Sequence, residues 1–154
     1  MTDPPFRGAF AHQHHDPRGL AARIEAQIRE RLEEAVEMAA LKLMVDLRAR
    51  HGLPAPETSS ANDRKEFDAI TGDLLAHLRA AFVAELSAED RHALEEVEAT
   101  LSNERHRILA GQALLARRLP DYWQRFESHH AEYIKSRLQT PPQKSGWLGR
   151  LFRN

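Results

Sequence analysis

The chain has 154 residues, of which 42% are hydrophobic and 29% charged, and it contains no cysteine. These values are ordinary for one folded domain, and they exclude a disulfide framework, an iron–sulfur cluster and a thiol nucleophile. The 22 basic and 23 acidic residues leave a net charge of −1. Since the basic excess of a nucleic-acid-binding domain is missing, no nucleic-acid partner is expected.

Residues 1–15, MTDPPFRGAFAHQHH, have the composition of a flexible arm, since proline and histidine interrupt every short apolar stretch. The arm therefore lacks the apolar core of a secretory signal. No run of about 18 apolar residues occurs in the sequence, so no membrane-spanning helix is expected. We accordingly expect a cytoplasmic protein.

The first predicted helix covers about residues 17–51 and is long for a globular protein. Asp16 is suited to cap it, and Pro17 occupies the first helical position, where a missing N–H costs nothing. Gly52 stands where a left-handed residue commonly ends a helix, and Pro54 follows it. At about 1.5 Å per residue, this element would be roughly 50 Å long.

The rest of the folded region is also predicted to be helical, because no segment alternates with period two for long enough to indicate a strand. Ser87 and Asp90 form the signature of a helix N-terminus, and Pro120 and Asp121 restart the chain after the third helix. Whether the third helix is broken near Ser102 stays open. The predicted architecture is an all-α bundle of about four helices within residues 16–139, with the later helices at about 63–86, 87–118 and 121–139.

Two apolar rows run along the middle of the first predicted helix. One row contains Val36, Ala40, Leu43 and Leu47, and nearly opposite lie Met38, Leu41 and Val45. A helix that packs on one face does not need the second row. Either the helix is central in its own bundle and contacted from both sides, or the second row is an oligomer interface. Because so long a helix is expected to extend past its neighbours, we favour a homo-oligomer, and among oligomers a dimer.

The predicted third helix carries an apolar column at seven-residue spacing, as coiled coils do. The column consists of Leu94, Leu101, Ile108 and Leu115. The neighbouring column includes the charged Glu104, which disfavours a two-stranded coiled coil. We interpret the apolar column as one face of the bundle core, and we hypothesise that Gly111 allows a second helix to approach closely.

The sequence favours a non-enzymatic protein. It contains no Gly-rich phosphate loop, no dinucleotide fingerprint and no nucleophile elbow. Two Glu-x-x-His pairs, Glu89/His92 and Glu127/His130, have the spacing used by di-iron bundles. An antiparallel helical hairpin would separate the pairs by about 25 Å, so neither a metal nor another cofactor is expected. Catalytic residues scattered along the chain would, however, leave no such signature.

His130 is the one histidine placed centrally in an apolar stripe of the fourth predicted helix. The stripe also contains Tyr122, Trp123, Phe126, Tyr133 and Ile134. We interpret His130 as a hydrogen-bonded core histidine. The alternatives are a pH-sensitive packing element and a cofactor-binding bundle in which His130 ligates a haem.

Residues 140–154, TPPQKSGWLGRLFRN, contain a spacer rich in breakers of helices, followed by an amphipathic segment. A helix starting at Gly146 would carry apolar side chains on one face and basic side chains at its edge and opposite side. Interfacial membrane helices have this layout. The apolar residues are Trp147, Leu148, Leu151 and Phe152, and the basic residues are Lys144, Arg150 and Arg153.

The stretch GWLGRLF at residues 146–152 resembles the C-terminal membrane-targeting sequence of the Min-system ATPases, which position division sites in bacteria. Those tails share the order Gly, aromatic, Leu, any residue, Arg, Leu, Phe. The resemblance is confined to this stretch and implies a mode of attachment, reversible binding to the inner face of a membrane. LGRLF is also loosely similar to the tags that load cargo into encapsulin shells.

Taken together, these features predict an oligomeric helical adaptor or scaffold that is peripheral on the inner membrane. Residues 147–153 would attach it reversibly, and several tails on one oligomer would strengthen the weak binding of a single tail. One alternative is that the tail is a linear docking motif for a protein partner. Another is that the tail folds back onto its own bundle.

Overall fold

The computed structural model describes residues 17–57 and 59–139, so the predicted arm at 1–15 and the tail at 140–154 lie outside the described residues. Every regular element in the described part of the chain is a helix, which confirms the all-α prediction. This part contains five helices rather than about four. They are α2 (Pro17–Arg50), α3 (Ala61–Val83), α4 (Ala88–Glu98), α5 (Glu104–Arg118) and α6 (Tyr122–Gln139).

The long first helix ends as predicted, at a left-handed glycine. Gly52 has a φ of 68°, and α2 ends two residues earlier. The N–H of Leu53 donates to the carbonyl of Arg48 at 2.8 Å, and the N–H of Gly52 donates to the carbonyl of Ala49 at 3.2 Å. This pair of bonds is the Schellman motif, which satisfies carbonyls that the helix end would otherwise leave unpaired.

The predicted third helix is two helices, so the seven-residue column does not run along a single helix, although its members Leu94, Ile108 and Leu115 are buried in the core. The Asn103 side chain accepts a hydrogen bond from the His106 N–H at 3.0 Å and caps α5, so the helical ladder starts afresh after a short loop. The loop contains the half-buried Leu101. α4 folds back on α5, and the buried Leu94 lies against Gly111. Gly111 therefore allows the close helix approach that the sequence suggested.

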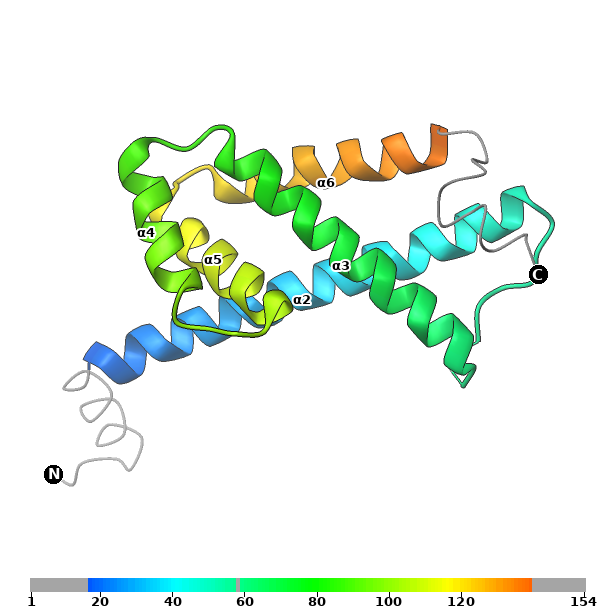
Figure 1. Ribbon diagram of the computed structural model, residues 1–154, viewed down its shortest axis with the longest axis horizontal. Coiled ribbons are helices and arrows are strands. Elements are labelled where there is room, and N and C mark those ends of the chain that lie inside the picture. The colour runs from blue at the N-terminus through cyan, green and yellow to red at the C-terminus, as the bar shows by residue number, and fades with distance from the viewer. Residues whose placement is uncertain (1–16, 58, 140–154) are drawn as a thin grey trace, which may run out of the picture.

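The core lies between α2, α3, α5 and α6, each of which packs against the other three, while α4 packs on α5. Buried aromatic side chains join α3 to α6: the rings of Phe82 and Tyr122 stack with their centroids 4.9 Å apart. Figure 1 shows α3 crossing α2, and the first turns of α2 projecting past the other helices. One long side of α2 is left without a described helix against it.

Candidate interaction surface on helix α2

The two apolar rows of α2 have different surroundings. The first row, Val36, Ala40, Leu43 and Leu47, is buried in the core. In the second row, Met38, Leu41 and Val45 are 66%, 45% and 40% exposed. No described helix covers the second row, so the interpretation in which α2 is contacted from both sides within its own bundle does not hold for this part of the chain.

Two further exposed apolar residues lie on the same side of α2. Leu20 and Ile24 are 43% and 41% exposed in the projecting first turns. Leu20 precedes Met38 by about five helical turns, which brings both to the same side of the axis. The exposed face of α2 therefore comprises two apolar spots on one helix, Leu20 with Ile24 and Met38 with Leu41 and Val45.

Ion pairs border the second of these spots. Arg105 of α5 donates to the Glu37 carboxylate at 2.9 Å, and the Lys42 ammonium lies 4.0 Å from the Asp46 carboxylate. Exposed pairs of this kind contribute at most about 1 kcal/mol to stability. An apolar centre with a charged border is, however, the usual composition of a protein interface.

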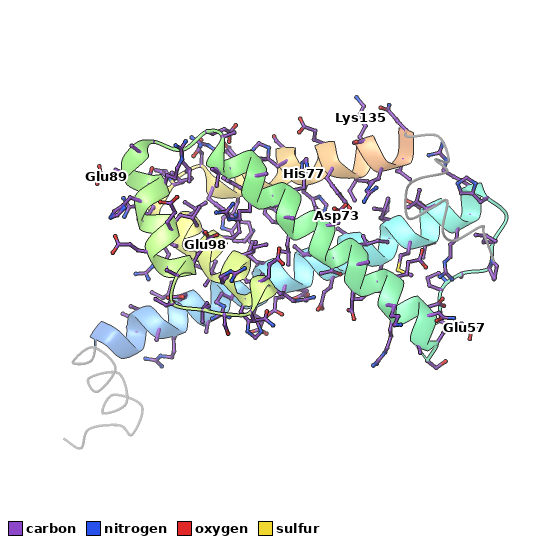
Figure 2. All side chains as sticks on the ribbon, in the orientation of Figure 1. Glu57, Asp73, His77, Glu89, Glu98 and Lys135 are labelled. Atoms are coloured by element: carbon purple, nitrogen blue, oxygen red, sulfur yellow. The ribbon has the colours of Figure 1, made fainter. Side chains whose placement is uncertain are left out.

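Two depressions flank the exposed face of α2, and both are mostly apolar inside. The first, called here the acidic hollow, has a volume of about 330 Å³ and is lined by Leu41, Met44, Pro56, Glu57, Asp63, Arg64, Phe67 and Asp68. The second, called the lysine groove, has a volume of about 570 Å³ and is lined by Ala39, Lys42, Leu43, His130, Ala131, Ile134, Lys135, Leu138 and Gln139. In Figure 2, Glu57 marks the side of the hollow and Lys135 the side of the groove.

The two depressions carry opposite charge. Three carboxylates and one guanidinium line the acidic hollow, whereas two ammonium groups and none of the described carboxylates line the lysine groove. The hollow was not expected from the sequence. Its lining comes from three separate segments, so no local pattern indicates it.

A buried charge cluster lies beside the acidic hollow. Arg48 is only 8% exposed, donates to Asp63 at 2.7 Å and also pairs with Glu66. The hydrogen bond from Arg48 and then the Glu57 N–H hold the pKa of Asp63 below its ordinary value. One guanidinium thus serves two carboxylates, and Oε2 of Glu66 is buried without a hydrogen-bond partner in the described part of the chain.

His130 lies at the edge of the core on α6 and lines the lysine groove. Its ring stacks on Phe126 with the centroids 5.8 Å apart. The expected hydrogen bond is missing at one nitrogen, because Nε2 is buried and has no partner among the described residues. Burial lowers the pKa of His130, because it disfavours the charged ring, and the nearby Glu127 carboxylate opposes this shift.

A polar network joins α3 to α6 on a different side of the bundle. The Tyr133 hydroxyl donates to Asp73 at 2.7 Å, and Arg137 pairs with the same carboxylate and donates to the Tyr133 oxygen at 3.2 Å. Burial is the main reason that the pKa of Tyr133 is raised. His77 lies on the same side, 4.0 Å from Glu132 (Figure 2). These groups are engaged with one another, and we interpret them as a structural link between two helices.

Within residues 17–57 and 59–139, no group of three or more histidine, aspartate and glutamate side chains is arranged to hold a metal ion. His92 lies on the surface and pairs with Glu96 at 3.1 Å, away from Glu127 and His130 on α6. The predicted docking residues of the tail, Trp147, Leu148, Arg150, Leu151, Phe152 and Arg153, lie outside the described residues.

None of the described helices has the length and the apolar composition needed to cross a bilayer. No protein-family model matches the chain, and neither a curated protein nor a solved structure is significantly similar to it. The described fold alone therefore assigns the protein to a structural class, that of all-helical bundles. Among the described residues, the exposed face of α2 and the two depressions beside it are surfaces that could bind a partner.

Proposed function

We propose that the protein is a non-enzymatic helical adaptor or scaffold that self-associates through the exposed face of α2. The observation that carries this proposal is the exposure of Met38, Leu41 and Val45 on the side of α2 opposite its buried row. Fully burying a side chain of this size contributes about 1.5–3 kcal/mol. A second copy of the chain would cover the row, which is otherwise an open apolar patch.

The spacing of the two apolar spots favours antiparallel pairing of α2 with α2 of a second copy. A two-fold axis near the middle of α2 would bring Leu20 and Ile24 of each copy opposite the Met38 spot of the other. The interface would then be self-complementary, and it would extend over most of the length of the helix. A dimer is accordingly the proposed form.

We further propose that residues 140–154 attach the oligomer reversibly to the inner surface of a membrane. The support is the sequence, which combines four large apolar residues with Lys144, Arg150 and Arg153 and includes no acidic residue in this segment. Each basic residue adds about 1 kcal/mol near an anionic surface. A segment this short is marginal as a free helix, so a single tail binds weakly and two tails on a dimer bind much more strongly.

Co-sedimentation with anionic liposomes tests the membrane proposal, comparing the full chain with a chain that ends at Gln139. We expect only the full chain to pellet, and we expect added salt to release it. The Met38→Asp variant of the full chain should pellet less, because a monomer presents one tail. If neither chain pellets, the membrane proposal is wrong, and the tail is then a candidate linear docking motif for a protein partner, whose binding through an apolar groove should depend less on salt.

A second candidate function is cofactor binding at His130. The buried Nε2 without a partner among the described residues favours it, as does the position of the ring beside the lysine groove, where Lys42 and Lys135 would face an anionic ligand. The ring would have to turn toward the groove to ligate a haem. Titration with haemin tests this candidate: a Soret band that appears with the natural chain and not with His130→Phe supports it, and identical spectra exclude it.

A further inference from the structure

We infer that the acidic hollow is the docking site of the chain's own residues 140–154. The inference deepens the proposed function of the tail and rests on it in one respect: docking would hold the tail away from the membrane. The hollow thus becomes an autoinhibitory site. Three features support this assignment, which are the shape of the hollow, its charge, and the reach of the chain from the end of α6.

The hollow fits one large apolar side chain with its neighbour. Its apolar lining consists of Leu41 and Met44 of α2, Phe67 of α3 and Pro56 of the loop between them. A volume of about 330 Å³ is at the lower end of the range for sites that bind small ligands. The tail offers Trp147 with Leu148, an aromatic anchor of the type that dominates the energetics of many interfaces.

The charge of the hollow matches that of the tail. Glu57, Asp63 and Asp68 line the rim with Arg64, and the neighbouring Arg48 is shared between Asp63 and Glu66. Counting these six side chains, four are acidic and two are basic, so the region carries a negative excess. The tail carries three basic residues and no acidic one. Opposite charges around an apolar anchor direct docking to this site.

The lysine groove provides an internal comparison. It is also apolar, it is larger, and it begins where α6 ends, because Gln139 lines it. Lys42 and Lys135 stand at this groove, and they would repel a basic tail. If apolar surface and proximity alone decided where the tail goes, the groove would be the better site. Charge selects the hollow instead.

The tail is long enough to reach the hollow. Gln139 lines the lysine groove together with Leu43, whereas Met44, the next residue of α2, lines the hollow. The two depressions therefore lie on neighbouring sides of α2, a helix about 10–12 Å wide with its side chains. Trp147 is eight residue steps after Gln139, a distance of up to about 26–29 Å when the chain is extended. The end of α6, the end of α2 and the start of α3 lie at the same end of the molecule (Figure 1).

A pair of engineered cysteines tests the inference in the full chain. The natural chain contains no cysteine, so a disulfide between two introduced thiols has no competing partner. One variant combines Ser145→Cys with Arg64→Cys at the hollow. The matched control combines Ser145→Cys with Lys135→Cys at the groove. Both partner positions are exposed and helical. The measurement is the rate of intramolecular disulfide formation in dilute protein under mild oxidation, read by peptide mass spectrometry.

The rates of disulfide formation in the 64/145 and 135/145 pairs are expected in opposite order for a docked and an undocked tail. An undocked tail should cross-link faster to position 135, because the loop from 135 to 145 is far shorter than the loop from 64 to 145. A docked tail should cross-link at least about tenfold faster to position 64, since docking raises the effective concentration of the thiol there. If the pair at position 135 reacts faster, or if the two rates are equal, the inference is wrong.

Charge reversal at the rim gives an independent readout. The double variant Glu57→Arg with Asp68→Arg should slow the cross-link of the 64/145 pair by about tenfold. The same substitutions should increase pelleting of the cysteine-free chain with anionic liposomes, because the tail is released. Unaltered cross-linking in the reversed variant would overturn the inference. A fast 64/145 cross-link in a protein that does not pellet even after charge reversal at the rim would instead refute membrane attachment and leave the docking site standing.

Discussion

A β-carbon placed on Gly111 of α5 would lie 2.5 Å from Cδ1 of Leu94 on α4. This contact sets how closely the two helices approach after the chain turns back at residues 99–103. Leu94 is 1% exposed and has little room to move. Glycine is thus needed at position 111 because Leu94 leaves little space for a β-carbon, and not because the backbone conformation there requires glycine.

Gly111→Ala should therefore destabilise the protein. Overpacking costs about 1–3 kcal/mol, which exceeds the gain of about 1 kcal/mol that alanine brings inside a helix. Gly72→Ala in α3 is the matched control, because a β-carbon added there would have no described atom within 4 Å apart from its chain neighbours and the backbone of its own helix, and it should stabilise by about 0.5–1 kcal/mol. Urea denaturation of both variants measures whether each substitution lowers or raises the free energy of unfolding. Combining Gly111→Ala with Leu94→Ala should cost less than the sum of the single changes.

Arg48→Met should cost about 3–5 kcal/mol, because it leaves the Asp63 and Glu66 carboxylates without their buried counter-ion. The pH dependence provides the check. Because Arg48 lowers the pKa of Asp63 in the folded state, this carboxylate contributes stability above its ordinary pKa of 3.8 and loses that contribution as the pH falls further. Stability should thus fall below about pH 4 in the natural chain, and less steeply in Arg48→Met. Parallel pH profiles would contradict this assignment.

His130 should make the protein sensitive to mild acid. Its folded-state pKa is below the ordinary value of 6.5, because burial disfavours the charged ring. The neutral ring therefore contributes stability above pH 6.5 that is lost as the pH falls through the folded-state pKa. Thermal unfolding followed between about pH 7.5 and 5 should show this loss in the natural chain. In His130→Phe it should be reduced, and an unchanged slope would assign the effect to other groups.

Substitutions in the two rows of α2 should separate folding from association. Met38→Asp changes an exposed side chain, so it should shift the protein toward monomer with a stability change within about 0.5 kcal/mol. Leu43→Asp buries a carboxylate in the core and should prevent folding. Sedimentation equilibrium gives the mass, and circular dichroism gives the fold. A natural chain that is monomeric at high concentration would exclude the proposed interface.

The helix ends were predictable because short-range chemistry decides them. Gly52 ends α2 and Ser87 caps α4, where its side chain accepts from the Asp90 N–H at 3.1 Å. The break before α5 was ambiguous, since the spacing of Leu94, Leu101 and Ile108 continues across it as it would in one helix. The Asn103 cap and the packing of α4 on α5 distinguish the two possibilities.

The exposed row was found in the sequence, whereas the hollow beside it was not. Met38, Leu41 and Val45 belong to one helix, so their arrangement follows from helical periodicity. The hollow is formed where α2 crosses α3 and the loop returns at Pro56, and this arrangement depends on tertiary packing. Sequence reasoning could not show that Nε2 of His130 has no hydrogen-bond partner among the described residues, because periodicity places a residue on a face without specifying its hydrogen-bond partners.

Leu41 belongs both to the exposed row and to the lining of the acidic hollow. One side chain cannot be covered by two occupants at once, so a neighbouring copy and the chain's own tail would exclude each other there. Dimerisation would then release each tail from its acidic hollow and would also bring two tails together on one dimer. The amount of protein held at a lipid surface should consequently rise more steeply than in proportion to the amount present, which would make abundance itself the signal for recruitment.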